Sequence, residues 1–493
     1  MRESGILMHI TSLPSPYGIG TMGAEAYSFV DFLKEAGQSV WQLLPLNPTG
    51  YGDSPYQSCS TFAGNPYLID LDQLIRDGLL TQEAVDSICW QQTEDRVDFG
   101  IQYENRRRVL RMAYDKFADG EALDSFCREN SDYLADYALF MALKDENDGK
   151  PWYQWDDPLK FRDPDALWHA RQSLKDTIRF YSFQQYLFDS QWKKLRAYAN
   201  AAGVRIIGDV PIYVPIDSVE VWVSPELFQL DQDLNPEAVA GCPPDAFCED
   251  GQLWGNPLYR WEKHARDGYN WWIRRMAAAA KRYDVTRIDH FRGFESYYCV
   301  PYGEPTARNG KWVKGPGMAL IDAFRKGLPG VEMIAEDLGF ITPEAIALRD
   351  GSGFPGMKIV QFGFDTLEAN DYSPHNYTRS SVCYTGTHDN MPVKQWLESL
   401  SPECLRYAAE YMTLNEAEGS VWGVIRTAMS SVSDLSVVQM QDVLELGEEG
   451  RMNSPGTTGT NWTWRAQPGF ASHALAQKIY CLTKRYDRLG AQK

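Results

Sequence analysis

Short apolar runs rich in β-branched residues recur along the chain, and most are bounded by Gly, Pro, Asp or Asn. Such runs are typical of buried parallel strands, because both faces of these strands lie against apolar neighbours. Segments with the apolar spacing of helices lie between several of the runs, and this alternation predicts a parallel sheet. We expect eight strands, at residues 5–10, 39–46, 205–214, 285–291, 331–338, 357–364, 381–388 and 437–443.

Eight parallel strands with intervening helices predict an α/β protein with a (β/α)8 barrel, the TIM barrel. Residues 24–36 form one expected helix, because Gly37 follows as a left-handed terminus. Another is expected to begin at Pro343, with Thr342 as its N-cap. A last helix near residues 471–485 is expected to close the barrel, and no separate C-terminal β-domain is expected after it.

Two intervals between predicted strands are too long for simple connections. Residues from approximately 47 to 204 separate the second and third strands, and apolar positions recur there at helical spacing. Residues from approximately 215 to 284 separate the third and fourth strands. We therefore expect one catalytic barrel over residues 1–493, with large, mainly helical insertions in these two intervals.

Charge and cysteine content exclude several classes of function. The net charge of −19 argues against nucleic acid and anionic membranes as partners. Nine cysteines without a CxxC pair favour reduced thiols in the cytoplasm, and Cys242 and Cys248 lack the further ligands of a zinc site. The early apolar run is too short for a signal peptide, and no apolar stretch reaches the roughly 18 residues of a membrane span. We expect a cytoplasmic protein without a cofactor or metal.

Acidic residues stand at the ends of four predicted strands: Asp209, Asp289, Glu336 and Asp389. In a (β/α)8 barrel the carboxyl ends of the strands form the face that carries the active site. Two carboxylates that face each other across a sugar are the equipment of a glycosidase. The spacing of these acids therefore predicts an active site for sugar chemistry.

The segment RIDHFRG at 287–293 is the sharpest local signal. Arg287 and Asp289 are two positions apart in a strand, so their side chains share a face. A neighbouring arginine lowers the pKa of an aspartate and keeps it ionised, and an aligned carboxylate can attack an anomeric carbon. A structural Arg–Asp pair inside the barrel explains the motif equally well.

The segment AEDLG at 335–339 offers a second carboxylate. Adjacent residues of a strand point in opposite directions, so only one of Glu336 and Asp337 is expected in the site. Glu336 has the longer reach, and burial beside Asp289 would raise its pKa as a general acid requires. For Asp337, capping of the next helix is as good an interpretation as a role in the site.

The segment GTHDN at 386–390 places His388 beside Asp389. A carboxylate accepts hydrogen bonds from two adjacent sugar hydroxyls, and an imidazole can donate to another, although the same residues could cap a helix. Loops at the expected barrel mouth add Tyr56, His375 and Asn461. A long Pro- and Gly-rich loop at 241–256 reads as a lid or binding loop.

In these motifs the chain resembles the 4-α-glucanotransferases, or amylomaltases, of glycoside hydrolase family 77. The resemblance runs from about residue 5 to 465 and is carried by GDSPYQS, GDVPIYV, GCPPDAFCEDGQLWGNPLYRW, RIDHFRG, AEDLG, GTHDN and NSPGTTGTNW. It implies that Asp289 is the nucleophile, that Glu336 is the acid/base, and that Asp389 holds the donor sugar and favours its distortion.

The resemblance also implies a set of substrate-binding residues around these three acids. Arg287 would orient Asp289, and His388 would assist Asp389. The remaining positions that we assign to substrate binding are Asp209, Tyr56, Trp254, Phe247, Asp245, His375 and Asn461.

The implied activity is transfer of α-1,4-glucan segments from a donor to glucose or to a maltooligosaccharide, with retention of configuration. The expected partners are therefore α-1,4-glucans and glucose, and we expect a monomer or a weak homo-oligomer. The alternatives are a retaining α-glucan hydrolase of the α-amylase clan and a catalytically silent glucan-binding barrel. The covering loop argues against the hydrolase, and the presence of both Asp289 and Glu336 argues against the silent barrel.

Overall fold

The computed structural model describes residues 2–50, 52–244, 249–339, 341–457 and 459–490. All eight predicted barrel strands are present and every pair between them is parallel. In barrel order they are β10 (Gly356–Ile359), β11 (Ser381–Tyr384), β12 (Leu435–Gln439), β1 (Glu3–Leu7), β2 (Val40–Gln42), β3 (Arg205–Val210), β6 (Val285–Ile288) and β9 (Glu332–Ala335).

Closure of the barrel occurs between β9 and β10. The Ala335 amide donates a hydrogen bond to the carbonyl of Pro355, just before β10, at 3.0 Å. The Asp337 carboxylate accepts the Met357 amide at 2.7 Å beside it. One backbone bond and one side-chain bond therefore join the two ends of the sheet, which confirms the (β/α)8 barrel.

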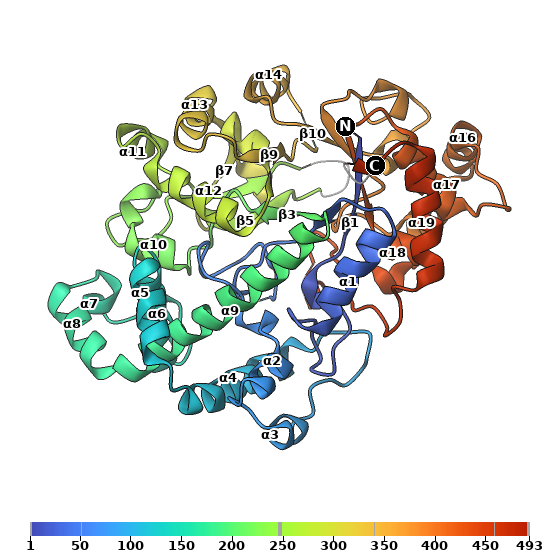
Figure 1. The fold of residues 1–493 in the computed structure, drawn as a ribbon. Helices are drawn as coiled ribbons and strands as arrows, with labels where there is room; N and C mark the ends of the chain where they lie inside the picture. The colour runs from blue at the N-terminus through green and yellow to red at the C-terminus, as the bar shows by residue number, and fades with distance from the viewer. Residues whose placement is uncertain (1, 51, 245–248, 340, 458, 491–493) are drawn as a thin grey trace.

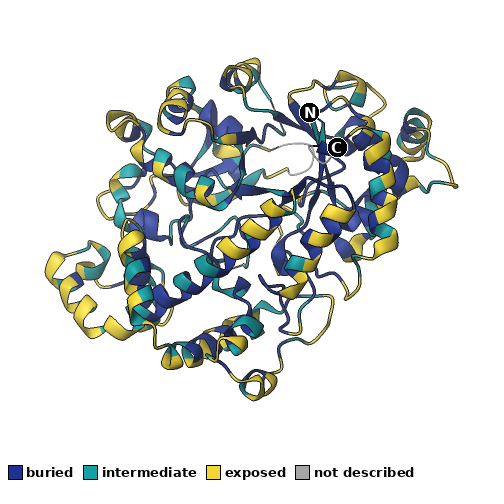
Figure 2. Ribbon diagram, viewed as in Figure 1, coloured by how far each residue is buried: buried dark blue, intermediate teal, exposed yellow. Residues whose placement is uncertain are grey.

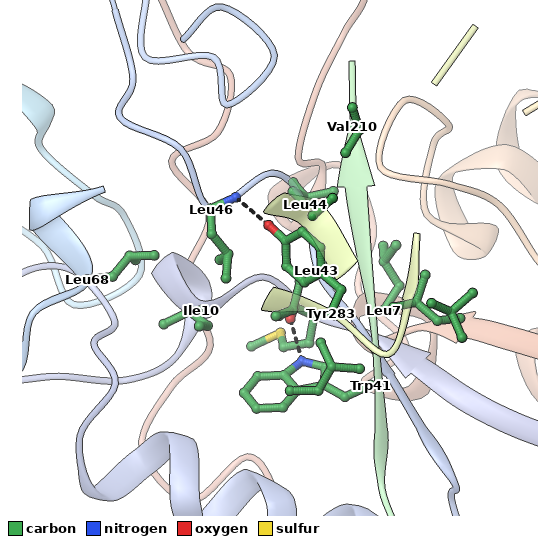
Figure 3. Packing of buried hydrophobic residues seen from close by; sticks show 14 of the residues in the cluster. Leu7, Ile10, Trp41, Leu43, Leu44, Leu46, Leu68, Val210 and Tyr283 are labelled. Carbon is green, nitrogen blue, oxygen red and sulfur yellow. Dashed lines mark hydrogen bonds between the residues drawn. The ribbon is translucent and has the colours of Figure 1, made fainter. Parts of the chain in front are cut away.

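Several strands end earlier than their apolar runs do. The run at 39–46 yields only β2, Val40–Gln42, although Leu43, Leu44 and Leu46 are buried as well. These leucines pack among other buried apolar side chains, as Figure 3 shows. Burial therefore extends past the last ladder bond, and an apolar pattern alone does not mark where pairing stops.

The helices around the barrel wrap the sheet, with buried faces inward and exposed faces outward (Figures 1 and 2). The expected helix at 24–36 is α1 (Ala24–Glu35), and the last helix is α19 (His473–Arg485), which packs on α1. The outer set also includes α12 (Asn270–Arg282), α13 (Met318–Gly327), α14 (Pro343–Ser352), α15 (Val393–Ser399), α16 (Pro402–Met412) and α17 (Ser420–Ser430). Thr342 caps α14 as expected, accepting the Ala345 amide.

Residues between β2 and β3 form a helical lobe on one side of the barrel (Figure 1). Its longest member, α9 (Lys175–Ala201), runs back to the barrel and packs on α6 (Leu134–Glu146) and α1. The other helices are α2 (Leu71–Arg76), α3 (Gln82–Asp86), α4 (Phe99–Lys116), α5 (Gly120–Glu129), α7 (Asp157–Lys160) and α8 (Pro164–Ser173). None of the helices in the described ranges is long and apolar enough to span a membrane.

A second sheet lies beside the barrel mouth, and the sequence analysis did not anticipate it. Its antiparallel strands are, in order, β5 (Gln252–Pro257), β4 (Ala238–Cys242), β7 (Ser296–Pro301) and β8 (Lys311–Lys314). Much of the presumed loop at 241–256 is thus a hairpin of β4 and β5. The prediction of a mainly helical second insertion was incomplete, because Gly, Pro and Asn in these short strands hide their pairing. The interval also holds α10 (Val219–Val223) and α11 (Trp261–Arg266).

The outer face of β3 lies very close to Tyr283, a residue just before β6. Gly208 alternates with the inward-facing Asp209, so it points toward the helices. A Cβ at Gly208 would lie 2.1 Å from the ring of Tyr283. The Tyr283 hydroxyl in turn accepts the Leu46 amide at 3.3 Å, as Figure 3 shows. Glycine is therefore required at position 208 by the buried aromatic ring against it.

We expect Gly208→Ala to lower the free energy of unfolding by about 1–3 kcal/mol, because the methyl group overpacks the Tyr283 ring. Guanidinium unfolding measures this change. The matched control is Gly120→Ala at the first residue of α5, where the nearest atom to a new Cβ is at the end of the long Arg179 side chain, 3.4 Å away. The control should be neutral or slightly stabilising. Equal unfolding midpoints for the two variants would contradict the expectation.

Candidate active site

Three of the strand-end acids lie at the carboxyl ends of the adjacent barrel strands β3, β6 and β9, and the fourth follows β11, beyond β10. Asp209 is in β3, and Asp289 directly follows β6. Glu336 directly follows β9, and Asp389 lies in the loop that follows β11. In the ladder, Asp209 is paired with Arg287, so both point to the same side of the sheet. The barrel therefore gathers these groups at one end, as the strand register requires.

Arg287 links two of these acids through a single nitrogen atom. Its Nη1 donates to Asp209 Oδ2 at 2.6 Å and to Asp289 Oδ1 at 3.1 Å. The side chains of Arg287 and Asp209 are 4% and 1% exposed, whereas that of Asp289 is 27% exposed. Burial lowers the pKa of Arg287, but the charges of the two carboxylates outweigh this effect and raise the pKa well above its ordinary value. Arg287 is thus a fixed cation at the base of the site.

Burial and Arg287 act in opposite directions on the two aspartates. Burial raises the pKa of Asp209 to about 7, and it also raises the pKa of Asp289. The positive charge of Arg287 opposes both changes. The expectation that Arg287 lowers the pKa of Asp289 describes the smaller of two effects. Because Asp289 is the more exposed carboxylate, water still solvates it and favours its ionised form.

Glu336 is held by two backbone amides. Its Oε2 accepts the amide of His290 at 2.6 Å, and its Oε1 accepts the amide of Leu338 at 2.8 Å. Burial raises the pKa of Glu336 to about 7, and the charge of Asp289 adds to this rise while Arg287 opposes it. Glu336 therefore has both a fixed position and the raised pKa that a general acid needs.

His290 reaches Glu336 only because its backbone adopts the left-handed conformation, with φ 51° and ψ 45°. This region is uncommon for residues other than glycine. The ring of Trp254 packs edge-on against the His290 imidazole, with centroids 4.9 Å apart. Burial lowers the pKa of His290 to about 3, so the ring is neutral. Nothing in the segment RIDHFRG predicts this role for His290, because an amide contact leaves no pattern in the sequence.

Asp337 points away from the other acids. It accepts the Met357 amide and pairs with Arg349 Nη1 at 2.6 Å. Of the two neighbours, only Glu336 joins the site, as strand alternation predicts. Asp337 does not cap the next helix, since Thr342 does so; it joins β9 to β10 instead.

Aromatic and polar side chains connect Asp209 with Asp389. The Tyr56 hydroxyl donates to Asp209 Oδ2 at 2.9 Å, and its ring stacks on His388 with centroids 5.0 Å apart. His388 Nε2 lies 3.4 Å from Asp389 Oδ2, and Asn453 Nδ2 donates to Asp389 Oδ1 at 2.6 Å. Burial lowers the pKa of His388. These contacts connect Asp389 to the group around Arg287.

Three of the expected binding residues lie in different settings. Trp254 joins the site through His290 and also packs near Tyr213, with ring centroids 6.2 Å apart. Asn461 bonds its own loop: its Oδ1 accepts the Ser454 amide at 3.0 Å. His375 Nδ1 lies 2.8 Å from the hydroxyl of Tyr411. The structure gives neither Asn461 nor His375 a contact with the four acids, and it places Asn453 beside Asp389 instead.

Asp245 and Phe247 lie outside the described residues. Within the part of the chain that is described, no group of three or more His, Cys, Asp or Glu side chains is placed to hold a metal ion. Seven described cysteines, Cys59, Cys89, Cys127, Cys299, Cys383, Cys404 and Cys481, have free thiols. The site therefore offers carboxylates, a buried cation, neutral imidazoles and aromatic rings, a set suited to acid–base and nucleophilic chemistry on an uncharged polyhydroxyl substrate.

Comparison with known proteins agrees with this chemistry. The family model described as 4-alpha-glucanotransferase matches residues 8–471. A 4-alpha-glucanotransferase from Clostridium butyricum is 47% identical over 98% of this chain and 100% of its own length. A 4-alpha-glucanotransferase from Thermus thermophilus is 46% identical over 99% of both chains.

Solved structures give the same result. An amylomaltase from Streptococcus agalactiae, in complex with acarbose, has a TM-score of 0.97 and 43% identity, over 99% of this chain and 100% of that chain. An amylomaltase from Corynebacterium glutamicum, 20% identical, shares the fold with a TM-score of 0.79 over 99% of this chain and 75% of its own. The chain therefore belongs to the 4-alpha-glucanotransferase family, glycoside hydrolase family 77, and is a transferase.

Proposed function

We propose that this enzyme cleaves an α-1,4-glucan and transfers one segment to the 4-hydroxyl of glucose or of an acceptor maltooligosaccharide. The observation that carries the proposal is the pairing of Glu336, a buried acid held by two amides, with Asp289, a more exposed carboxylate held by Arg287. A retaining glycosidase needs this division between an acid and a nucleophile. The full-length match to 4-alpha-glucanotransferases supports transfer as the outcome.

In the first step, Glu336 gives its proton to the glycosidic oxygen while Asp289 attacks the anomeric carbon. The bond from that carbon to the leaving oxygen breaks, and an ester to Asp289 forms. In the second step, Glu336 takes the proton of the acceptor 4-hydroxyl, whose oxygen displaces Asp289. Two inversions at one carbon give net retention.

The other site residues bind the donor sugar in this proposal. Asp389 accepts two of its hydroxyls, and its 45% exposed carboxylate can exchange water for them. His388 assists Asp389, and Tyr56 presents an aromatic face beside it. Arg287 donates a hydrogen bond to Asp289 and so orients it, and Asp209 accepts a second hydrogen bond from Arg287 and balances its charge. Trp254 is assigned a contact with the glucan chain, and Asp245 and Phe247, which lie outside the described residues, keep their expected role in substrate binding.

Transfer requires that an acceptor sugar outcompete water for the glycosyl-enzyme. Aromatic residues such as Trp254 can position a sugar and exclude water at once. His375 and Asn461 are proposed for glucan contacts further from the reacting bond, since their own hydrogen bonds are to Tyr411 and to Ser454 rather than to the four acids. The free thiols fit a reducing compartment such as the cytoplasm. The proposed monomer or weak homo-oligomer needs no residue of a partner subunit in the site.

Incubation with maltotriose tests the function directly. We expect free glucose together with a ladder of longer maltooligosaccharides, because each transferred segment lengthens an acceptor. Chromatography of the products distinguishes the outcomes. Glucose and maltose alone would identify a hydrolase, and unchanged maltotriose with measurable binding would identify a silent glucan-binding barrel.

A donor with a fluoride leaving group separates the roles of the two carboxylates. Fluoride leaves without protonation, so Glu336→Gln should still release about one fluoride per enzyme from an α-maltosyl fluoride in a burst. With maltotriose the same variant should lose about 10²–10⁴-fold in kcat. Asp289→Asn should fail with both donors.

Thermal unfolding of both variants serves as the control, since each exchange removes a charge but keeps the shape of the side chain. A fluoride burst in Asp289→Asn, or none in folded Glu336→Gln, would contradict the assignment. Equal behaviour of the two variants would show that the roles are not divided.

The pKa of Glu336, about 7, predicts the alkaline side of the pH profile. Glu336 must be protonated to act as the acid, so kcat/KM for maltotriose should fall as the pH rises through about 7. On the acid side, kcat/KM should fall as Asp289 is protonated, at a pH above the ordinary aspartate pKa of 3.8. With maltosyl fluoride the alkaline fall in the fluoride burst should disappear. A rate that is constant from pH 5 to 9 with both donors would refute this account.

A further inference from the structure

We propose that Asp442 is a positioning residue for Asp389, because it clamps both ends of the loop that carries this carboxylate. Asp442 belongs to α18 (Met440–Val443), the single turn directly after β12, and is completely buried. It does not belong to any of the motifs on which the site was predicted. The inference rests on the proposed function, in which Asp389 holds the donor sugar.

The clamp consists of two short hydrogen bonds to a neighbouring loop. Asp442 Oδ2 accepts the hydroxyl of Thr385 at 2.6 Å. Asp442 Oδ1 accepts the amide of Val393 at 2.7 Å. Thr385 directly follows β11, and Val393 is the first residue of α15. The two bonds therefore fix the beginning and the end of a segment whose middle is Asp389.

Asp389 depends on its backbone for its position more than the other acids do. Its carboxylate is 45% exposed, whereas Asp209 is enclosed and Glu336 is held by amides. Asn453 and His388 contact the Asp389 carboxylate, and His388 lies on the same loop. A half-exposed side chain keeps a fixed place only if the loop beneath it is rigid.

The interior of the loop is fixed by neighbouring groups that act with the clamp. Asn390 Oδ1 accepts both the amide and the hydroxyl of Thr387, at 2.8 and 3.0 Å. Gln361 Nε2 donates to the carbonyl of Met391 at 2.8 Å. A Cβ at Gly386 would come within 2.8 Å of the same Gln361 nitrogen. The loop is therefore packed as well as bonded, and Asp442 is its anchor.

The competing interpretation is that Asp442 only caps α15. Pro392 at the N-cap of α15 has no side-chain hydrogen bond to offer, so Asp442 supplies a cap from another element. A cap alone would change stability and leave the rate of the folded enzyme unaltered. A positioning residue would change kcat more than KM, because Asp389 acts on the distorted sugar in the transition state.

Asp70 provides a matched control. It is also buried and accepts one threonine hydroxyl, that of Thr21 at 3.0 Å, and one helix-terminal amide, that of Gln73 at 2.9 Å. It caps α2 in the helical lobe and has no contact with the site loop. Loss of Asp70 thus removes the same two kinds of hydrogen bond at a different place, together with an ion pair to the exposed Arg76 at 3.6 Å.

The experiment compares kcat, KM and thermal unfolding for maltotriose transfer in four variants. Asp442→Ala and Thr385→Val should lower kcat about tenfold to a hundredfold and change KM less, since displacing a reacting geometry by about 1 Å costs up to about 10²-fold. Asp442→Asn should restore most of the rate, because its amide can accept from Val393 and donate to the Thr385 oxygen. Asp70→Ala should unfold at a lower temperature with wild-type kcat.

Thr385→Val keeps the test decisive if Asp442→Ala does not fold. Wild-type kcat in folded Thr385→Val and Asp442→Ala, with destabilisation like that of Asp70→Ala, would overturn the clamp while leaving the proposed function intact. A wild-type protein that makes no maltooligosaccharide ladder would overturn the proposed function and the clamp together. Reduced kcat in Thr385→Val with normal kcat in Asp70→Ala supports the clamp.

Discussion

The guanidinium of Arg287 lies between two carboxylates inside the barrel, and the properties of the site depend on this contact. One positive charge faces Asp209 and Asp289 directly, with Glu336 close enough to affect the same balance. A single cation cannot neutralise all three of these acids. At least one acid is therefore favoured in its protonated form at neutral pH. The raised pKa of Glu336 follows from burial and from this excess of negative charge.

Strand alternation decides which side chains share that environment. Asp209 and Arg287 are ladder partners, and Asp289 lies two positions after Arg287. Glu336 follows β9, the next strand in the barrel. A shift of one residue in any of these strands would turn its functional group toward the helices. Gly208 shows the other half of the constraint, because the outward position beside Asp209 has no room for a side chain against Tyr283.

The sequence was sufficient to predict the eight strands and the four acids, because buried parallel strands and strand-end carboxylates both leave local patterns. It could not reveal the second sheet. In this sheet β4 and β5 join β7 and β8, although the barrel strand β6 lies between the two pairs in the sequence. It also missed Asn453, His290 and Asp442. Each of these acts through a contact with a residue far away in the chain, and neither composition nor periodicity records such a contact.

The choice between Glu336 and Asp337 shows the same limit within one motif. Strand alternation predicted that only one of the two acids would enter the site. The partners of Asp337, which are Arg349 and the Met357 amide, could be identified only from the structure. The two acids thus have complementary tasks. Asp337 joins β9 to β10 and closes the barrel, and this closure fixes the strand end from which Glu336 projects. The ring of strands and the placement of the acid are therefore parts of one arrangement.

Exposure increases from the base of the site outward, and this order suits a transferase. Asp209 and Arg287 are enclosed, Asp289 is partly exposed, and Asp389 is nearly half exposed. The inner charges are thus fixed before substrate arrives, so they need no reorganisation during the reaction. The outer carboxylates are accessible to solvent, and in the proposed reaction the hydroxyls of the donor sugar replace water as their hydrogen-bond partners. An acceptor sugar bound beside the glycosyl-enzyme would then meet it with few competing water molecules. In the proposed reaction, the preference for transfer therefore begins when the outer acids exchange water for sugar.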